Sequence, residues 1–241
     1  MRTAVTNLFQ RVLPLSILPR RLRYRLHRHL LKSETVTARV LDYEMKLPLQ
    51  LDGIGRILMV FGERELDQHY ILHQVLEPGN SVMDIGGNIG YYCSMVSRIV
   101  GTSGKIYCFE PDIRNFDILK QNIKINGGED IVEIFNAPVS DQVQEVDFHI
   151  ADASNLSSMH ITRGDENSVL ANRNMHNRTY KQTVKLTTVD FWEFVQNAER
   201  PVNLVRMDIE GHEAVIFKHF ADQLEKTQDF SCAPQTFIFE P

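Results

Sequence analysis

Cysteine and tryptophan are scarce in this chain of 241 residues, which contains three cysteines and one tryptophan. The cysteines, Cys93, Cys108 and Cys232, are odd in number and widely spaced, which argues against a disulfide framework and against a cysteine-rich metal site. The sequence also lacks a run of 18 apolar residues, which excludes a transmembrane helix of ordinary length. We therefore expect reduced cysteines in the core of a cytoplasmic protein.

An overall positive charge is lacking as well. The formal net charge is −5 and the isoelectric point is about 6.0, so we expect no nucleic-acid partner. Hydrophobic residues make up 43% of the chain and charged residues 24%, which is typical of a soluble globular protein.

Acidic residues are missing from residues 1–33, although this segment carries eight Lys or Arg residues. Pro14 and Pro19 interrupt it, so a single long helix is excluded. We expect a basic helical extension over residues 1–50, followed by one globular domain over residues 51–241. Three interpretations of residues 1–33 stay open: packing on the acidic body, peripheral contact with an anionic membrane surface, and cleavage as an organelle-targeting peptide.

Strands and helices are predicted to alternate from residue 81 onward. The predicted strands are 81–86, 105–110, 131–136, 203–209 and 236–240, and the predicted helices are 89–100, 113–125 and 212–225. This alternation indicates βαβ units and a doubly wound, mainly parallel sheet of the α/β class. A complete fold of this kind adds another helix and an antiparallel strand pair, so C-terminal strands are expected to be missing.

Shorter elements are predicted around this framework. The apolar stretches 36–41 and 57–61 indicate a β-hairpin or a small lid before the main sheet, and 66–76 has helical spacing. Alternation predicts strands at 146–151 and 184–188, and a helix over 190–197 follows them. The polar segment 152–182 is expected to be a loop that shapes a binding pocket.

A glycine-rich turn follows the first predicted strand of the sheet. Asp84, Gly86, Asn88 and Gly90 form the pattern D-x-G-x-N-x-G, and Glu110 ends the next predicted strand. In a doubly wound sheet such a turn lets the backbone approach a nucleoside, and the acid at the end of the second strand binds the ribose hydroxyls.

The spacing of this turn indicates which cofactor it binds. A dinucleotide site requires G-x-G-x-x-G, which Gly86, Gly87 and Gly90 do not match. A carboxylate such as Asp84 repels a phosphate and attracts a cation. S-adenosylmethionine carries a sulfonium, an ammonium and a ribose but no phosphate, so the pattern predicts this cofactor.

A second cluster of polar residues lies at the end of the predicted strand 203–209. Asp208, Glu210 and His212 are the expected catalytic residues there, because methyl transfer to a hydroxyl needs a general base beside the acceptor. Glu213 adds a third carboxylate at a helix start, where a capping role is also expected for one of the three. Asn136, after the third strand, is a candidate for the adenine edge.

A metal site is not expected, because the spacing of these carboxylates is not diagnostic of one. The open alternative is a divalent cation held by Asp208 and a second carboxylate such as Glu240.

The chain resembles the FkbM family of S-adenosylmethionine-dependent methyltransferases over about residues 60–240. The matching segments are 78–79, 82–92, 104–106, 109–111, 187–190 and 205–213, with Asn122, Asn126, Ala137, Ser140 and Asp141 between them. Arg206 departs from the lysine that the family usually has, while the charge is kept.

This resemblance implies a Rossmann-like class I methyltransferase fold for the domain over residues 51–241. It implies O-methylation of a hydroxyl on a sugar, a glycan or a secondary metabolite, with cofactor contacts from Asp84, Gly86, Asn88, Gly90 and Glu110. The alternative is a catalytically inactive module that binds the cofactor and serves as a scaffold. A nicotinamide-dependent oxidoreductase is disfavoured by the glycine spacing.

Overall fold

The computed structural model describes residues 18–49, 53–151, 157–159, 180–209, 211–228 and 230–239. The chain divides into two compact units, residues 1–67 and residues 68–241. The expected domain boundary after residue 50 stays a prediction. Part of the basic segment, residues 1–17, lies outside the described residues.

The first unit combines two short helical segments, a β-hairpin and a third helix. Its elements are α2 (Arg20–Arg25), η2 (Leu26–Leu31), β1 (Thr35–Val40), β2 (Tyr43–Pro48) and α3 (Ile54–Phe61). Strands β1 and β2 pair antiparallel, which confirms a hairpin in this region. Its second strand was expected at residues 57–61, and this is wrong because that segment belongs to α3.

Side-chain periodicity explains the correction. In β2 the buried Tyr43, Met45 and Leu47 alternate with polar residues, which is the pattern of a strand with one covered face. In α3 the buried Ile54 and Leu58 are four residues apart, as one face of a helix requires. The stretch 57–61 is therefore the end of an amphipathic helix.

Five parallel strands form the central sheet of the second unit, in the order β11-β10-β3-β4-β5. They are β3 (Ser81–Ile85), β4 (Lys105–Phe109), β5 (Val132–Phe135), β10 (Leu204–Met207) and β11 (Thr236–Phe239). The first of them, β3, lies between β4 and β10, so the strand order reverses at the junction of β3 and β10. This confirms the predicted doubly wound parallel sheet.

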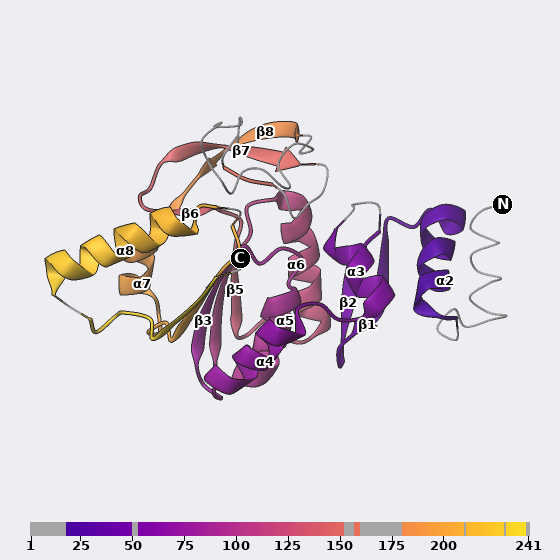
Figure 1. The fold of residues 1–241 in the computed structure, drawn as a ribbon, viewed down its shortest axis with the longest axis horizontal. Coiled ribbons are helices and arrows are strands. Elements are labelled where there is room, and N and C mark those ends of the chain that lie inside the picture. The colour runs from indigo at the N-terminus through magenta and orange to yellow at the C-terminus, as the bar shows by residue number, and fades with distance from the viewer. Residues whose placement is uncertain are drawn as a thin grey trace. The chain divides into compact units, whose positions relative to one another are not determined.

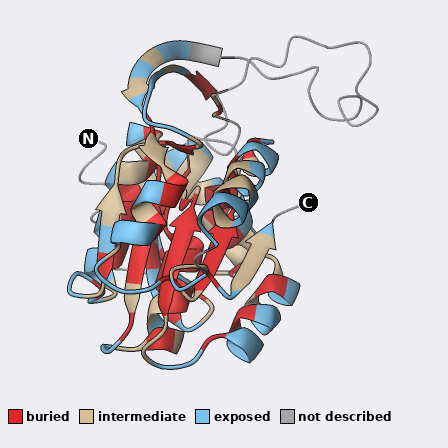
Figure 2. Ribbon diagram, turned by 90° about the vertical axis from the view of Figure 1, so that its left-hand side faces the viewer, coloured by how far each residue is buried: buried red, intermediate tan, exposed pale blue. Residues whose placement is uncertain are grey.

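Helices cover both faces of this sheet (Figure 1). They are α4 (Leu66–Val75), α5 (Tyr91–Val100), α6 (Ile113–Ile125), α7 (Phe191–Asn197) and α8 (Glu213–Thr227). Helices α5 and α6 lie on one side, and α7 and α8 on the other. Figure 2 shows the central strands as the buried part of the unit, as expected for a parallel sheet covered on both faces.

A hydrophobic core lies between the sheet and the helices α7 and α8. Phe191 of α7 and Ile216 of α8 pack in one cluster with Met83, Phe109 and Met207 of the strands. All five of these side chains are fully buried. The core therefore fixes β3, β4 and β10 against each other, and with them the loops at their ends.

Two small strand pairs complete the unit. They are β6 (Val139–Ser140) with β9 (Val189–Asp190), and β7 (Glu145–Ala151) with β8 (Tyr180–Thr187). Strand β7 pairs antiparallel with β8, and residues 180–182, expected in the loop, belong to β8. Residues 152–156 and 160–179 lie outside the described residues. In the described part of the chain, every helix is too short or too polar to span a bilayer.

Candidate functional site

The glycine-rich turn lies at the carboxyl end of β3, next to the point where the strand order reverses. The backbone N–H groups of Gly86 and Gly87 both donate to the carbonyl of Phe109, at 2.9 Å each. Gly86 has φ +88°, and a Cβ there would lie 2.1 Å from the carbonyl oxygen of Asp208. Only glycine fits this position, so the turn packs directly on the end of β10.

The second half of the turn leads into α5. Asn88 has φ +50°, and its Oδ1 accepts from the N–H of Ile89 at 2.8 Å. Gly90 caps the helix with φ +84°, and a Cβ there would approach Leu119 to 2.7 Å. The side-chain amide of Asn122 donates to the Ile89 carbonyl at 2.7 Å. The expected turn residues thus hold one compact, hydrogen-bonded loop.

Glu110 follows β4 and faces this turn. Its Oε2 accepts from the N–H of Asn88 and its Oε1 from the N–H of Asp112, both at 2.8 Å. The residue is 5% exposed, and this burial raises the pKa of Glu110 to about 8, although both hydrogen bonds oppose the shift. The sequence predicted that this carboxylate and the turn act together, and the structure brings them into direct contact.

A charged cluster joins β3 and β10 across the sheet. The guanidinium of Arg206 lies 3.1 Å from Oδ1 of Asp84 through Nη1 and 3.2 Å from Oδ2 of Asp208 through Nη2. The ring of Tyr92 stacks against the guanidinium, with 3.7 Å between the ring centroid and Cζ of Arg206. Burial raises the pKa of Asp84, and the positive charge of Arg206 opposes that shift.

The two carboxylates of this cluster differ in their access to solvent. The side chain of Asp84 is 2% exposed, whereas that of Asp208 is 30% exposed. Asp208 is therefore the more solvent-accessible of the two carboxylates.

The neighbouring acids have different places. Glu213 accepts from the N–H groups of Ile209 and Gly211, at 2.9 Å each, so its carboxylate holds the loop that precedes α8. The N-cap residue of α8 is His212, so the capping role expected for one of the three carboxylates stays a prediction. Glu210 lies outside the described residues, and its catalytic role stays a prediction.

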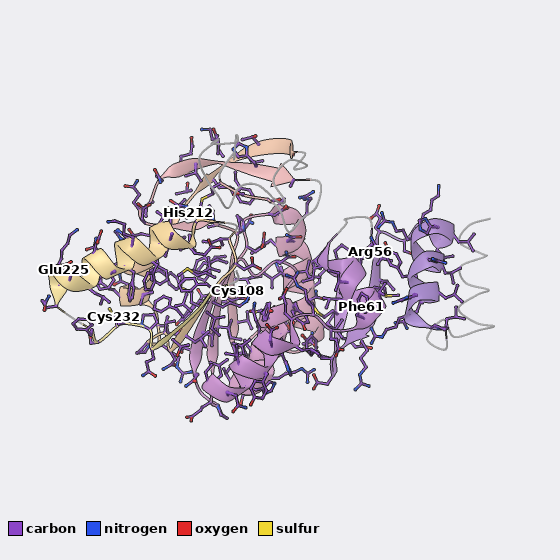
Figure 3. All side chains as sticks on the ribbon, viewed as in Figure 1. Arg56, Phe61, Cys108, His212, Glu225 and Cys232 are labelled. Carbon is purple, nitrogen blue, oxygen red and sulfur yellow. The ribbon has the colours of Figure 1, made fainter. Side chains whose placement is uncertain are left out.

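His212 is buried immediately before the first turn of α8 (Figure 3). Its Nε2 lies 3.0 Å from the hydroxyl oxygen of Ser140, and that hydroxyl donates to Oδ1 of Asp141 at 2.9 Å. Because the hydroxyl has one proton, the Nε2–H of His212 is then the donor to Ser140. His212 therefore links α8 to β6 and contributes to placing the loop that precedes the helix.

Asn136 also engages the backbone around the site. Its side-chain amide nitrogen donates to the carbonyl oxygens of Glu110 and Pro111, at 2.8 and 3.0 Å. These bonds stabilise the segment that carries the Glu110 carboxylate. The adenine contact expected for Asn136 stays a prediction.

Two polar residues of this region were missed as functional candidates in the sequence. Arg206 is a charged residue inside the apolar strand Leu204–Met207. A buried charge requires a partner, so this charge within an apolar run was the sequence signal that could have identified it.

Asp112 is fully buried and caps α6 through the N–H of Arg114. It also accepts from Ser157 at 2.9 Å, while Arg114 donates to the Ala151 carbonyl at 2.8 Å. These bonds tie the end of β7 to the site.

One buried group in the described residues brings potential metal ligands together. Ligand atoms of Asp84, Cys93 and Cys108 lie within 4.8 Å of one another, and both cysteines are free thiols. The hydrogen bond with Cys93, and then burial, raise the pKa of Cys108 well above its ordinary value, which favours the thiol over the metal-binding thiolate. Glu240, the second carboxylate of the alternative metal site, lies outside the described residues.

Comparison with known proteins identifies similar sequences. The profile described as the methyltransferase FkbM domain matches residues 84–239, which include the turn, Glu110 and Asp208. The hexuronic acid methyltransferase AglP of Haloferax volcanii is 25% identical over 190 residues, and the match covers 78% of this chain and 69% of that protein.

Solved structures show a weaker likeness. An rRNA methylase from Streptococcus thermophilus gives a TM-score of 0.35 at 13% identity, over 67% of this chain and 64% of that chain. A SAM-dependent O-methyltransferase from Thermotoga maritima gives a TM-score of 0.30 at 18% identity, over 44% of each chain. The chain thus spans less than two thirds of both structures, and at these scores neither informs the function.

Proposed function

Because the chain belongs to the FkbM methyltransferase family, we propose that it transfers a methyl group from S-adenosylmethionine to a hydroxyl group of a sugar or glycan. One observation supports this most. Asp84 and Glu110, from the neighbouring strands β3 and β4, lie on either side of a glycine turn at the reversal of strand order. Ligands bind at such a reversal, and two carboxylates there suit a ligand that carries cationic groups and a ribose.

The residues of the turn would hold this cofactor. Glu110 would accept hydrogen bonds from the ribose hydroxyls, and Asp84 would attract the cationic aminoacyl end, while Gly86 and Gly90 let the turn pack closely on Asp208 and Leu119. Asn88 fixes the conformation of the loop through its own backbone contacts. When bound, S-adenosylmethionine supplies the methyl group on a sulfonium, which needs no metal ion to make it electrophilic.

Asp208 is our candidate for the general base. It is the more exposed of the two carboxylates that contact Arg206, and it follows the strand beside the turn. In this role its carboxylate accepts the proton that the acceptor hydroxyl loses as the new C–O bond forms. Glu210 is the second carboxylate of this proposal, and His212 acts through the placement of the loop between β10 and α8.

The acceptor class is proposed from the relative. The protein from Haloferax volcanii acts, by its name, on a hexuronic acid, so a sugar or glycan is the acceptor to test first. A hexuronic acid offers both hydroxyl groups and a carboxylate. Methylation of a hydroxyl requires removal of a proton, whereas an ionised carboxylate has no proton to lose. A methyl ether product therefore indicates a reaction that uses a base, and a methyl ester product indicates one that does not.

Calorimetric titration with S-adenosylmethionine and S-adenosylhomocysteine tests the cofactor. We expect micromolar binding by the natural protein and loss of binding in Glu110→Ala, with Glu129→Ala as a control because Glu129 is exposed on the turn after α6. If the folded natural protein binds neither compound, the proposed cofactor is wrong.

Transfer of a labelled methyl group to hexuronic acids, neutral hexoses and glycans tests the reaction. Transfer to a sugar hydroxyl, identified by mass spectrometry of the product, is the expected result. Binding of the cofactor without transfer to any acceptor would support the alternative of an inactive scaffold module.

A further inference from the structure

The exposed face of α2 and η2 carries positive charge and apolar side chains together. Arg21, Arg25 and His29 recur every four residues, and all three are exposed. Beside this row lie Leu22 and Leu30, which are 51% and 66% exposed. Large apolar side chains on a helix surface are costly in water when they gather with others, so this face calls for an explanation.

Helix α3 extends the same face. Its last residue, Phe61, is 60% exposed, and the guanidinium of Arg21 lies 5.9 Å from its ring centroid. Arg56 lies about one and a half helical turns before Phe61, and Figure 3 labels both residues on α3. Arg56 is exposed as well, and its guanidinium lies 6.0 Å from the ring centroid of Tyr24. Cation–π contacts thus hold two arginines against aromatic rings at the border of this face.

The face belongs to a packed part of the first unit. Tyr24 is buried on the inner side of α2. Arg20 donates to the carbonyl of Arg39 at 2.9 Å and to that of Leu58 at 3.3 Å, which ties α2 to the hairpin and to α3. The exposed side chains therefore project from an ordered scaffold.

The charged residues of α2, η2 and α3 all have the same sign. Residues 18–33 and 53–62 carry seven Lys or Arg residues and no Asp or Glu, in a chain whose net charge is −5. Such a segregated positive surface fits an anionic partner.

We propose that this basic-apolar face, formed by Arg21, Leu22, Arg25, Leu30 and Phe61, docks on an anionic lipid bilayer. The arginines pair with lipid phosphates and carboxylates, and the leucines and the phenylalanine enter the boundary between headgroups and acyl chains. Nucleic acid matches the arginines alone, because a phosphate backbone leaves the two leucines in water. The inference concerns the first unit and does not depend on the methyltransferase reaction.

Co-sedimentation with lipid vesicles tests the proposal. We expect the full chain to bind vesicles that contain phosphatidylserine and to leave them at high salt, and to bind pure phosphatidylcholine weakly. The double variant Arg21→Glu with Arg25→Glu should lower the partition coefficient at least about tenfold, since each lost charge near the surface weakens binding about fivefold. The control, Lys120→Glu with Lys124→Glu, makes the same charge change on exposed positions of α6 and should bind like the natural protein.

The apolar residues have a separate test. Leu30→Ser with Phe61→Ser keeps the charge and should reduce binding severalfold at every salt concentration, whereas circular dichroism should show an unchanged fold. Equal binding by this variant, with displacement of the protein from vesicles by RNA, would assign the face to nucleic acid and overturn the proposal. Equal losses in the α6 control, or no binding by the natural protein, would overturn it as well.

Discussion

Arg206 and Asp84 lie opposite each other on the neighbouring parallel strands β10 and β3, with 3.1 Å between Nη1 of the guanidinium and Oδ1 of the carboxylate. The same guanidinium reaches Asp208 at the end of its own strand. One buried cation thus fixes the spacing between the carboxylate proposed for the cofactor and the carboxylate proposed as the base.

Replacement of Arg206 should lower the stability of the fold. Arg206→Met leaves Asp84 buried without its cation, which is expected to cost about 3–5 kcal/mol of unfolding free energy. Arg206→Lys keeps the charge but has one donor centre, so it cannot contact both carboxylates with the same geometry. Its loss of unfolding free energy should lie between zero and that of Arg206→Met. Urea denaturation measures both. Lys218→Met, which breaks an exposed pair with Asp222, is the control and should leave the midpoint unchanged.

Binding of the cofactor should strengthen as the pH rises toward 8. The pKa of Glu110 is about 8 because the group is buried, so below that pH most molecules carry a proton on the carboxyl group that must accept hydroxyl hydrogen bonds. Affinity for S-adenosylhomocysteine should therefore increase up to about tenfold per pH unit below the pKa and level off above it. Calorimetry in buffers of different ionisation enthalpy should show proton release on binding at neutral pH.

The raised pKa of Glu110 also makes the free energy of unfolding depend on pH. A pKa raised from 4.5 to about 8 means that the native state holds a proton which the unfolded chain has lost between these pH values. The stabilisation from this group is complete below pH 4.5 and is lost as the pH rises toward 8. Glu110→Gln cannot ionise, so it should flatten the pH dependence of both stability and binding. An unchanged pH profile in this variant would exclude Glu110 as the titrating group.

Gly86 should tolerate no larger residue. Gly86→Ala places a Cβ 2.1 Å from the Asp208 carbonyl oxygen in addition to the strain of a positive φ, and is expected to cost about 3 kcal/mol or more and to abolish cofactor binding. Gly127→Ala is a matched control, because Gly127 also has a positive φ but a Cβ there meets no atom within 4 Å. It should cost about 1–2 kcal/mol and leave binding intact. Equal effects of the two substitutions in thermal melts would contradict the proposed close packing.

Asp208→Asn should separate binding from chemistry. The amide keeps the shape of the side chain but cannot take up a proton, so turnover on a sugar hydroxyl should fall roughly 10²–10⁴-fold while cofactor affinity stays within a few-fold. Asp130→Asn, at an exposed turn, is the control. Turnover equal to that of the natural protein would remove Asp208 from the role of base, and it is the outcome expected if a carboxylate of the sugar is the acceptor.

The local sequence pattern was sufficient to predict most of the strands and helices of the second unit. The alternation of apolar strands and helices predicts the parallel sheet, and the turn after β3 brings Glu110 and Asn88 together because adjacent βαβ strands end at the same edge. The hairpin of the first unit shows where pattern was misread. Its strand Tyr43–Pro48 alternates polar and apolar residues, while the apolar run at 57–61 is also compatible with a helix face, and helix packing decided the outcome.

What the sequence by itself determined is the class of fold, the family and the glycine-rich turn, since these depend on short spacings within single strand–turn–helix units. Only the tertiary structure decided which distant groups meet. Arg206 pairs with Asp84 across 122 positions of the chain, and His212 contacts Ser140 across 72. Such contacts depend on strand order and register, which arise from packing the whole core and are not encoded in any local run of residues.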